Sequence, residues 1–126
     1  MDMVENIFHK RKIVYSKLIT YGFLKEGHEY VFKKKLSQSG LIMSVVILDT
    51  GQITAQVIDP STNEPYTLHL TYQAKGEFVH QVRTEYQEVL MDIADQCSEM
   101  DVFHAPITKS IIDYVNQKYG NELEFL

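Results

Sequence analysis

The sequence contains a single cysteine among its 126 residues, so Cys97 has no second cysteine in the chain with which to form a disulfide. One cysteine also excludes a zinc site built from several thiolates. The first residues are acidic and lack the apolar segment of a secretory signal peptide. Because disulfides and signal peptides accompany oxidising compartments, these absences predict a cytoplasmic protein.

Long hydrophobic runs are missing as well. The longest apolar stretch, residues 41–48, is interrupted by Ser44 and is far shorter than the roughly 20 apolar residues that cross a bilayer. The chain has no repeat and no linker rich in proline or glycine, and its 44% hydrophobic content is ordinary for a globular protein. We therefore predict one domain over residues 1–126, without a membrane segment.

Positive charge is scarce in most of the chain but not at its beginning. The net charge is −5. Residues 1–35 hold eight basic and four acidic residues, whereas residues 36–126 hold four basic and thirteen acidic ones, which gives net charges of +4 and −9. This asymmetry permits a basic patch but excludes a protein that coats nucleic acid with its whole surface.

The pattern of apolar residues predicts an α+β fold. Apolar residues recur every three or four positions in residues 4–21, which predicts an N-terminal helix that ends before Gly22. Alternating or β-branched segments predict a four-stranded antiparallel meander over residues 30–36, 41–48, 53–58 and 66–70. Short turns at residues 37–40 and 49–51 and a longer loop at residues 59–65 connect these strands.

Two C-terminal helices are expected to pack on the sheet. The first is predicted over residues 77–97, where Phe78, Val82 and Tyr86 begin a continuous apolar stripe. The second opens near Pro106 and reaches Lys118. Segment 41–48 is apolar on both faces, which is more than one layer of helices covers, so either the sheet curls or another surface covers its second face.

An ordered set of short phrases covers most of the chain: Lys17-Leu18, Tyr21-Gly22-Phe23, Val57-Ile58-Asp59, Tyr66-Thr67-Leu68-His69, Gly76-Glu77-Phe78-Val79, Val82-Arg83-Thr84-Glu85-Tyr86, Asp101-Val102-Phe103, Ile112-Asp113-Tyr114-Val115, Lys118-Tyr119-Gly120 and Glu122-Leu123-Glu124-Phe125-Leu126. Together they resemble the N-terminal region of the longer MmcQ/YjbR-like bacterial proteins. The resemblance implies a bacterial cytoplasmic protein of uncharacterised function. It also implies a second α+β domain after Leu126, for which DNA binding has been proposed. It transfers no catalytic residue to this chain.

The strongest candidates for binding chemistry are basic. Lys10, Arg11 and Lys12 form one group and Lys33, Lys34 and Lys35 another, and cations along a phosphate track are what nucleic-acid affinity requires. The competing interpretation is that Lys33–Lys35 protect an edge strand against aggregation. The sequence favours this second interpretation, because the remainder of the chain is acidic.

Other reactive residues lack the spacing of a catalytic or metal site. The five histidines contain no HExxH pair, and Cys97 continues the apolar stripe of the 77–97 helix, where a thiol packs as a small hydrophobe. The acidic run that contains Asp92 and Asp95 lacks the glycine and the ligand number of a calcium loop. We expect no catalytic residue, metal or cofactor.

The sequence therefore predicts a non-enzymatic interaction or regulatory module. Its partner is expected to be another protein or the domain that follows Leu126, because segment 41–48 is apolar on both faces and the last two residues are apolar. The alternative is a DNA-binding module that uses Lys10, Arg11, Lys12 and Lys33–Lys35.

Overall fold

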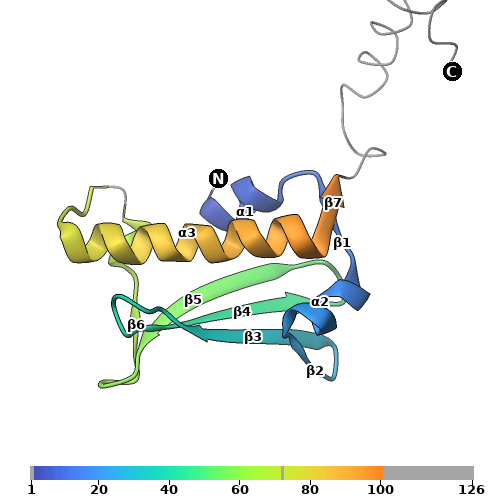
Figure 1. Ribbon diagram of the computed structural model, residues 1–126, viewed down its shortest axis with the longest axis horizontal. Helices are drawn as coiled ribbons and strands as arrows, with labels where there is room; N and C mark the ends of the chain where they lie inside the picture. Colours follow the sequence, from blue (N-terminus) through green and yellow to red (C-terminus); the bar gives the residue numbers. More distant parts are fainter. Residues whose placement is uncertain (1, 72, 101–126) are drawn as a thin grey trace, which may run out of the picture.

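The longest element of the protein is helix α3, Glu77–Cys97, which has the bounds predicted from the sequence. The computed structural model describes residues 2–71 and 73–100. Eight side chains along one face of α3 are buried: Val79, Val82, Tyr86, Val89, Leu90, Ile93, Ala94 and Cys97. The three- and four-residue spacing of these side chains places them on a single stripe, which packs against a β-sheet (Figure 1).

The sheet has five antiparallel strands in the order β2-β3-β4-β5-β6. Each strand is hydrogen-bonded to its neighbours in sequence, so the sheet is a meander, and α3 crosses only one of its two faces (Figure 1). The strands are β2 Leu24–Glu26, β3 Glu29–Lys35, β4 Ile42–Leu48, β5 Ile53–Asp59 and β6 Glu64–Tyr66. The mixed helix-and-sheet class and the antiparallel arrangement are confirmed.

The layout of the strands differs from the prediction. The sequence predicted four strands, but the short strand β2 precedes them and makes five. The segment predicted as the strand 66–70 leaves the sheet at Tyr66, and Leu68–Leu70 form the 3-10 helix η1. The Arg83 guanidinium explains this departure, because it donates to the carbonyls of His69 and Thr71, both at 3.0 Å, and so satisfies acceptors that strand pairing would otherwise use.

The predicted N-terminal helix over residues 4–21 is wrong. The segment divides into helix α1, Met3–Phe8, strand β1, Arg11–Ile13, and helix α2, Tyr15–Tyr21. Lys10 takes a positive φ of 56°, which a continuing helix does not allow. Strand β1 pairs antiparallel with β7, Ser98–Met100, immediately after α3, and this pairing buries Ile13.

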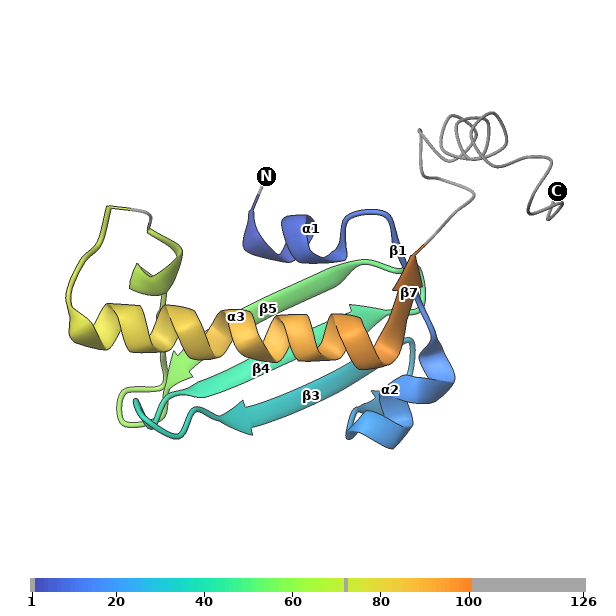
Figure 2. The ribbon, with the colours of Figure 1, turned by 45° about the horizontal axis from the view of Figure 1, so that its top comes forward.

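The three α-helices of the described residues share one layer over the sheet. Helix α1 contacts α3 and β5, and α2 contacts α3 near its C-terminal end (Figure 2). The α2 helix ends at Gly22, whose φ of 132° suits glycine, as the sequence predicted. Beyond it, the rings of Tyr21, Phe23 and Phe32 lie 5.1 to 6.0 Å apart and close this end of the core.

The second predicted C-terminal helix, near Pro106–Lys118, lies outside the described residues. Among the residues that are described, α3 is the one long helix. No helix in residues 2–71 and 73–100 is both long enough and apolar enough to cross a membrane.

Candidate interaction surface

Strand β4 presents apolar side chains to both faces of the sheet, as its sequence predicted. Met43, Val45 and Ile47 point toward α3 and are fully buried. Ile42, Val46 and Leu48 point to the opposite face and are only half-buried. None of the described helices lies on that opposite face (Figure 1).

The strand register shows which side chains share this uncovered face. Leu24, Val31, Val46 and Thr54 form one row across four strands, and Leu24 at its end is 68% exposed. A second row joins Lys35, Ile42 and Ile58, and a polar row of Lys33, Ser44 and Gln56 separates the two. We define the open face by its apolar members Leu24, Val31, Ile42, Val46, Leu48 and Ile58.

The predicted group Lys33–Lys35 lies at a step in the outline of the sheet. Strand β2 is three residues long and pairs with Glu29, Tyr30 and Val31, so it ends before the lysines. Within the described part of the chain, no strand lies beside β3 from Lys33 to Lys35 on this side, and the three side chains are exposed. We call this segment the β3 step. Its position agrees with the edge-strand interpretation of the lysines.

Lys34 differs from its two neighbours because it points toward the helices. It lines a groove of about 510 Å³ whose other walls come from α2, α3 and the β3–β4 turn: Tyr21, Ser37, Gln38, Glu85, Glu88, Val89 and Asp92. Glu85 holds that turn by accepting hydrogen bonds from the Ser37 and Gln38 amides at 2.9 and 3.2 Å. Two carboxylates of this groove, Glu88 and Asp92, are exposed.

The Tyr21 hydroxyl joins α2 to α3 at the end of the same groove. It donates to Asp92 at 2.7 Å, and burial together with this carboxylate raises the pKa of the Tyr21 hydroxyl. Asp92 also accepts a hydrogen bond from Gln96 at 2.8 Å. The groove wall is therefore fixed by bonds between side chains that lie far apart in the sequence.

The other predicted basic group is not continuous with the β3 step. Arg11 on β1 donates to the Ala94 carbonyl at 3.1 Å and to the Ser98 hydroxyl at 3.3 Å, and it lies 3.8 Å from Asp95. The turn after β3 is held at a different point of α3, because its Ser37 amide donates to Glu85. Glu85 and Ala94 lie roughly 14 Å apart along the axis of the helix. Figure 2 shows β1 and the C-terminal end of β3 at opposite ends of the molecule.

Lys10 and Lys12 flank this structural arginine. Lys10 occupies the left-handed turn before β1, and Lys12 is opposite Glu99 in the β1–β7 pair. Cross-strand neighbours of opposite sign attract one another, so part of the local positive charge is balanced within the fold. The structure therefore gives two separate basic groups rather than one track.

Buried His69 was not singled out by the sequence. Its ring is 1% exposed, stacks on Tyr66 at 5.7 Å and meets the edge of Tyr86 at 4.4 Å. Neither ring nitrogen has a hydrogen-bond partner among the described residues, and neither has the Tyr66 hydroxyl. Burial, with a smaller contribution from the Arg83 charge, lowers the pKa of His69 from 6.5 to about 4. The ring is therefore neutral at pH 7.

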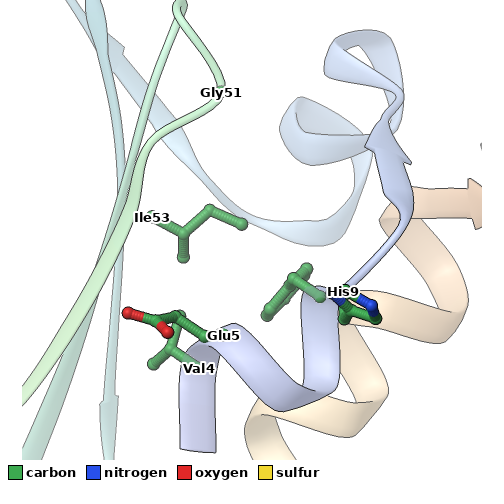
Figure 3. Close-up of a pocket in the computed structure, with 6 residues that line it drawn as sticks. Val4, Glu5, His9, Gly51 and Ile53 are labelled. Atoms are coloured by element: carbon green, nitrogen blue, oxygen red, sulfur yellow. The ribbon is translucent and has the colours of Figure 1, made fainter. Parts of the chain in front are cut away.

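A hollow beside His9 lies between α1 and the β4–β5 hairpin. It has a volume of about 330 Å³, and Figure 3 shows Val4, Glu5 and His9 on the side of α1, facing Gly51 and Ile53 on the hairpin. The last of its lining residues, Phe8, adds a buried aromatic ring. The lining contains no serine, threonine, cysteine or lysine, the side chains that most often serve as nucleophiles.

Cys97 has the structural role that its sequence position predicted. Its side chain is fully buried at the end of α3, with Sγ 3.7 Å from the Lys17 carbonyl. Burial, assisted by Asp92, raises the pKa of the Cys97 thiol. A buried neutral thiol is a poor nucleophile. Within residues 2–71 and 73–100, no cluster of three or more histidine, cysteine or acidic side chains could hold a metal ion.

Comparison with known proteins identifies no relative: no family model matches the chain, and neither a curated protein nor a solved structure matches it. The resemblance to MmcQ/YjbR-like proteins therefore stays a prediction. The functional argument depends on the geometry of the open face and the β3 step.

Proposed function

We propose that the chain is a non-enzymatic interaction module that docks a partner protein on the open face of its five-stranded sheet. The observation that carries this proposal is the double-sided apolar character of β4, which is covered on one face only by the described helices. Antiparallel sheets commonly leave one face in water, but that face is then usually polar. Here six apolar side chains occupy it.

The open face also indicates the chemistry of its partner. On the β3 side, Lys35 ends one apolar row, and Lys33 ends the polar row that lies between the two apolar rows. A partner that buries Leu24, Val31 and Val46 places its rim against these two ammonium groups. The proposal is therefore a protein with an apolar contact surface and an acidic margin.

Site-specific photocrosslinking in the native cell tests this function. Leu24 is replaced by p-benzoylphenylalanine in the full chain, and the matched control carries the same group at Met91, which is 47% exposed on the outer side of α3. We expect one dominant adduct from position 24, absent from position 91, whose yield falls at least tenfold with a second change, Val46→Glu. The adduct is identified by mass spectrometry and the purified partner is titrated.

Equal adducts from both positions, or an adduct that is indifferent to Val46→Glu, would rule out docking on the open face. The reason is that Val46 stands at the centre of the apolar row. Circular dichroism checks that the Val46→Glu protein is folded. Val46→Thr, a milder change of the same shape, is expected to weaken the adduct by a smaller factor.

A second candidate function is DNA binding, and the exposure of three consecutive lysines favours it. Titration of labelled duplex and single-stranded DNA at low and moderate salt tests this candidate. Binding that falls steeply with salt and disappears in a Lys33→Gln, Lys34→Gln, Lys35→Gln protein would support DNA. Absence of binding at low salt would exclude it.

A further inference from the structure

The backbone of the β3 step has hydrogen-bonding groups directed away from the sheet. In an antiparallel ladder, alternate residues of a strand bond to alternate neighbours. The Leu36 amide bonds to the Leu41 carbonyl at 2.8 Å, so Lys34 and Phe32 likewise direct their groups toward β4. Lys33 and Lys35 therefore direct one N–H and one C=O each toward the outer side.

These four groups are unpaired by the described residues. Strand β2 uses the equivalent groups of Glu29 and Val31, but it begins only at Leu24, opposite Val31. The chain before β2 turns away, because the Phe23 and Gly22 amides bond to the Leu18 carbonyl at the end of α2. The β3 step thus has room for a short strand in line with β2 and beside Lys33–Lys35.

The charges around the β3 step select which strand fits. Lysines at an open edge oppose pairing with a second copy of the same edge, because like charges would then be neighbours. They favour a strand that carries carboxylates. Lys33 and Lys35 share the open face, so acidic side chains at alternate positions would meet both of them.

The other face of the added strand would meet a different environment. Its intervening side chains would point into the groove beside Lys34, where Glu88 and Asp92 are exposed and Val89 is buried. A carboxylate there would be repelled, whereas a small neutral side chain would be accepted. The two faces together specify alternation of acidic and neutral residues.

We infer that the β3 step binds an extended peptide segment with acidic residues at every second position, by adding it to the sheet as a short strand. This inference rests on the proposed function as an interaction module and names the chemistry of one binding element. Main-chain bonds would give the affinity and the alternate carboxylates the specificity, as in other modes of strand addition.

Fluorescence anisotropy of the full chain with labelled peptides tests this inference. The probe is an eight-residue peptide of alternating glutamate and threonine. The matched control carries N-methylated glutamates, which keep the charge but remove the main-chain donors that would face Lys33 and Lys35. We expect the N-methylated peptide to bind at least tenfold more weakly. We expect a similar loss with Lys33→Gln, Lys35→Gln, and no change with Lys75→Gln, which removes an exposed lysine in the loop before α3.

Amide exchange measured by NMR gives a backbone readout at single residues. The Lys33 and Lys35 amides should exchange rapidly in the free chain and at least tenfold more slowly with the peptide bound. The Lys34 amide, already paired with β4, should exchange slowly in both states. Unchanged exchange at Lys33 and Lys35, or equal binding of the N-methylated peptide, would overturn strand addition.

The same titration separates this inference from the proposed function. Val46→Glu disrupts the open face without removing any backbone group of β3, so its peptide affinity should stay within about twofold. If the peptide binds but position 24 gives no adduct, docking on the open face is rejected and strand addition is retained. Tighter binding of a thymidine oligonucleotide with the same lysine dependence would assign the β3 step to nucleic acid and reject the peptide.

Discussion

The two faces of strand β4 share one backbone and similar apolar side chains, yet they have different surroundings. On one face, Val45 and Ile47 are sealed under α3 and fully buried. On the other, Ile42 and Val46 remain half-buried with no described helix above them. Apolar character in a strand thus indicates that a side chain suits a buried position. It does not indicate that the chain itself supplies the cover.

The largest expected difference between the faces is in stability. Ile47→Ala should lower the free energy of unfolding by about 3 kcal/mol, because it leaves a cavity beneath α3. Val46→Ala, on the open face, should cost less than about 1 kcal/mol, since water can fill the space. Urea denaturation measures both. Equal losses would mean that the open face is also covered in the full chain.

Acid should destabilise the covered side through His69. The pKa of His69 is about 4 in the folded protein and 6.5 when unperturbed, so the unfolded chain takes up this proton first as the pH falls. The contribution of the neutral His69 ring to the free energy of unfolding should be fully present above pH 6.5. It should fall by roughly 2 to 3 kcal/mol as the pH approaches 4. Urea denaturation across this range measures the slope.

The matched variants for this pH effect are His69→Phe and His80→Gln. The phenylalanine keeps an aromatic ring against Tyr66 and Tyr86 and should flatten the pH dependence. His80→Gln is the control, because it removes an exposed imidazole instead of the buried one. If His69→Phe retains the full slope, the buried imidazole is not its origin.

Removal of Arg83 should weaken the connection between η1 and α3. Its guanidinium donates to the carbonyls of His69, Thr71 and Ala74 at 3.0 to 3.1 Å. Arg83→Ala should cost about 2 kcal/mol, and Arg83→Lys should recover only part, because one ammonium cannot span three carbonyls. Thermal unfolding measures both. Full recovery by lysine would show that charge rather than the fork geometry matters.

The smallest effect is expected at the groove beside the β3 step. Glu85→Gln should cost about 1 kcal/mol, because a neutral amide oxygen accepts less strongly from the Ser37 and Gln38 amides. Glu88→Gln, in the same groove but exposed, should be close to neutral. A larger cost at Glu88 would indicate an additional structural contact.

The sequence predicted those elements that local periodicity determines. Helix α3 has the predicted bounds, strands β3 and β5 lie where alternation placed them, and β4 lies in the predicted apolar segment 41–48. The hairpin turn at Gly51, with φ 93°, was also predicted. In α3, β3 and β5 the pattern spans enough residues to distinguish a period of two from one near 3.6.

The missed features depend on partners distant in the sequence. The three- and four-residue spacing in residues 4–21 resembles a helix, but Ile13 is buried because β1 pairs with Ser98 and its neighbours. The burial of His69 follows from its position between Tyr66 and Tyr86, which no local pattern encodes. The β3 step likewise exists only because β2 pairs with Glu29–Val31 and leaves the last four residues of β3 without a neighbouring strand on that side.

The β1–β7 pair has a consequence for how the molecule is made. Arg11 and the Ala94 carbonyl are 83 residues apart in the sequence, and β1 finds its partner only after α3 is complete. At a synthesis rate of roughly 5 to 20 residues per second, Arg11 leaves the ribosome on the order of 10 s before its partners. Contacts of such long sequence separation slow folding. Strand β1 is therefore among the last parts of the nascent chain to form its native pairing.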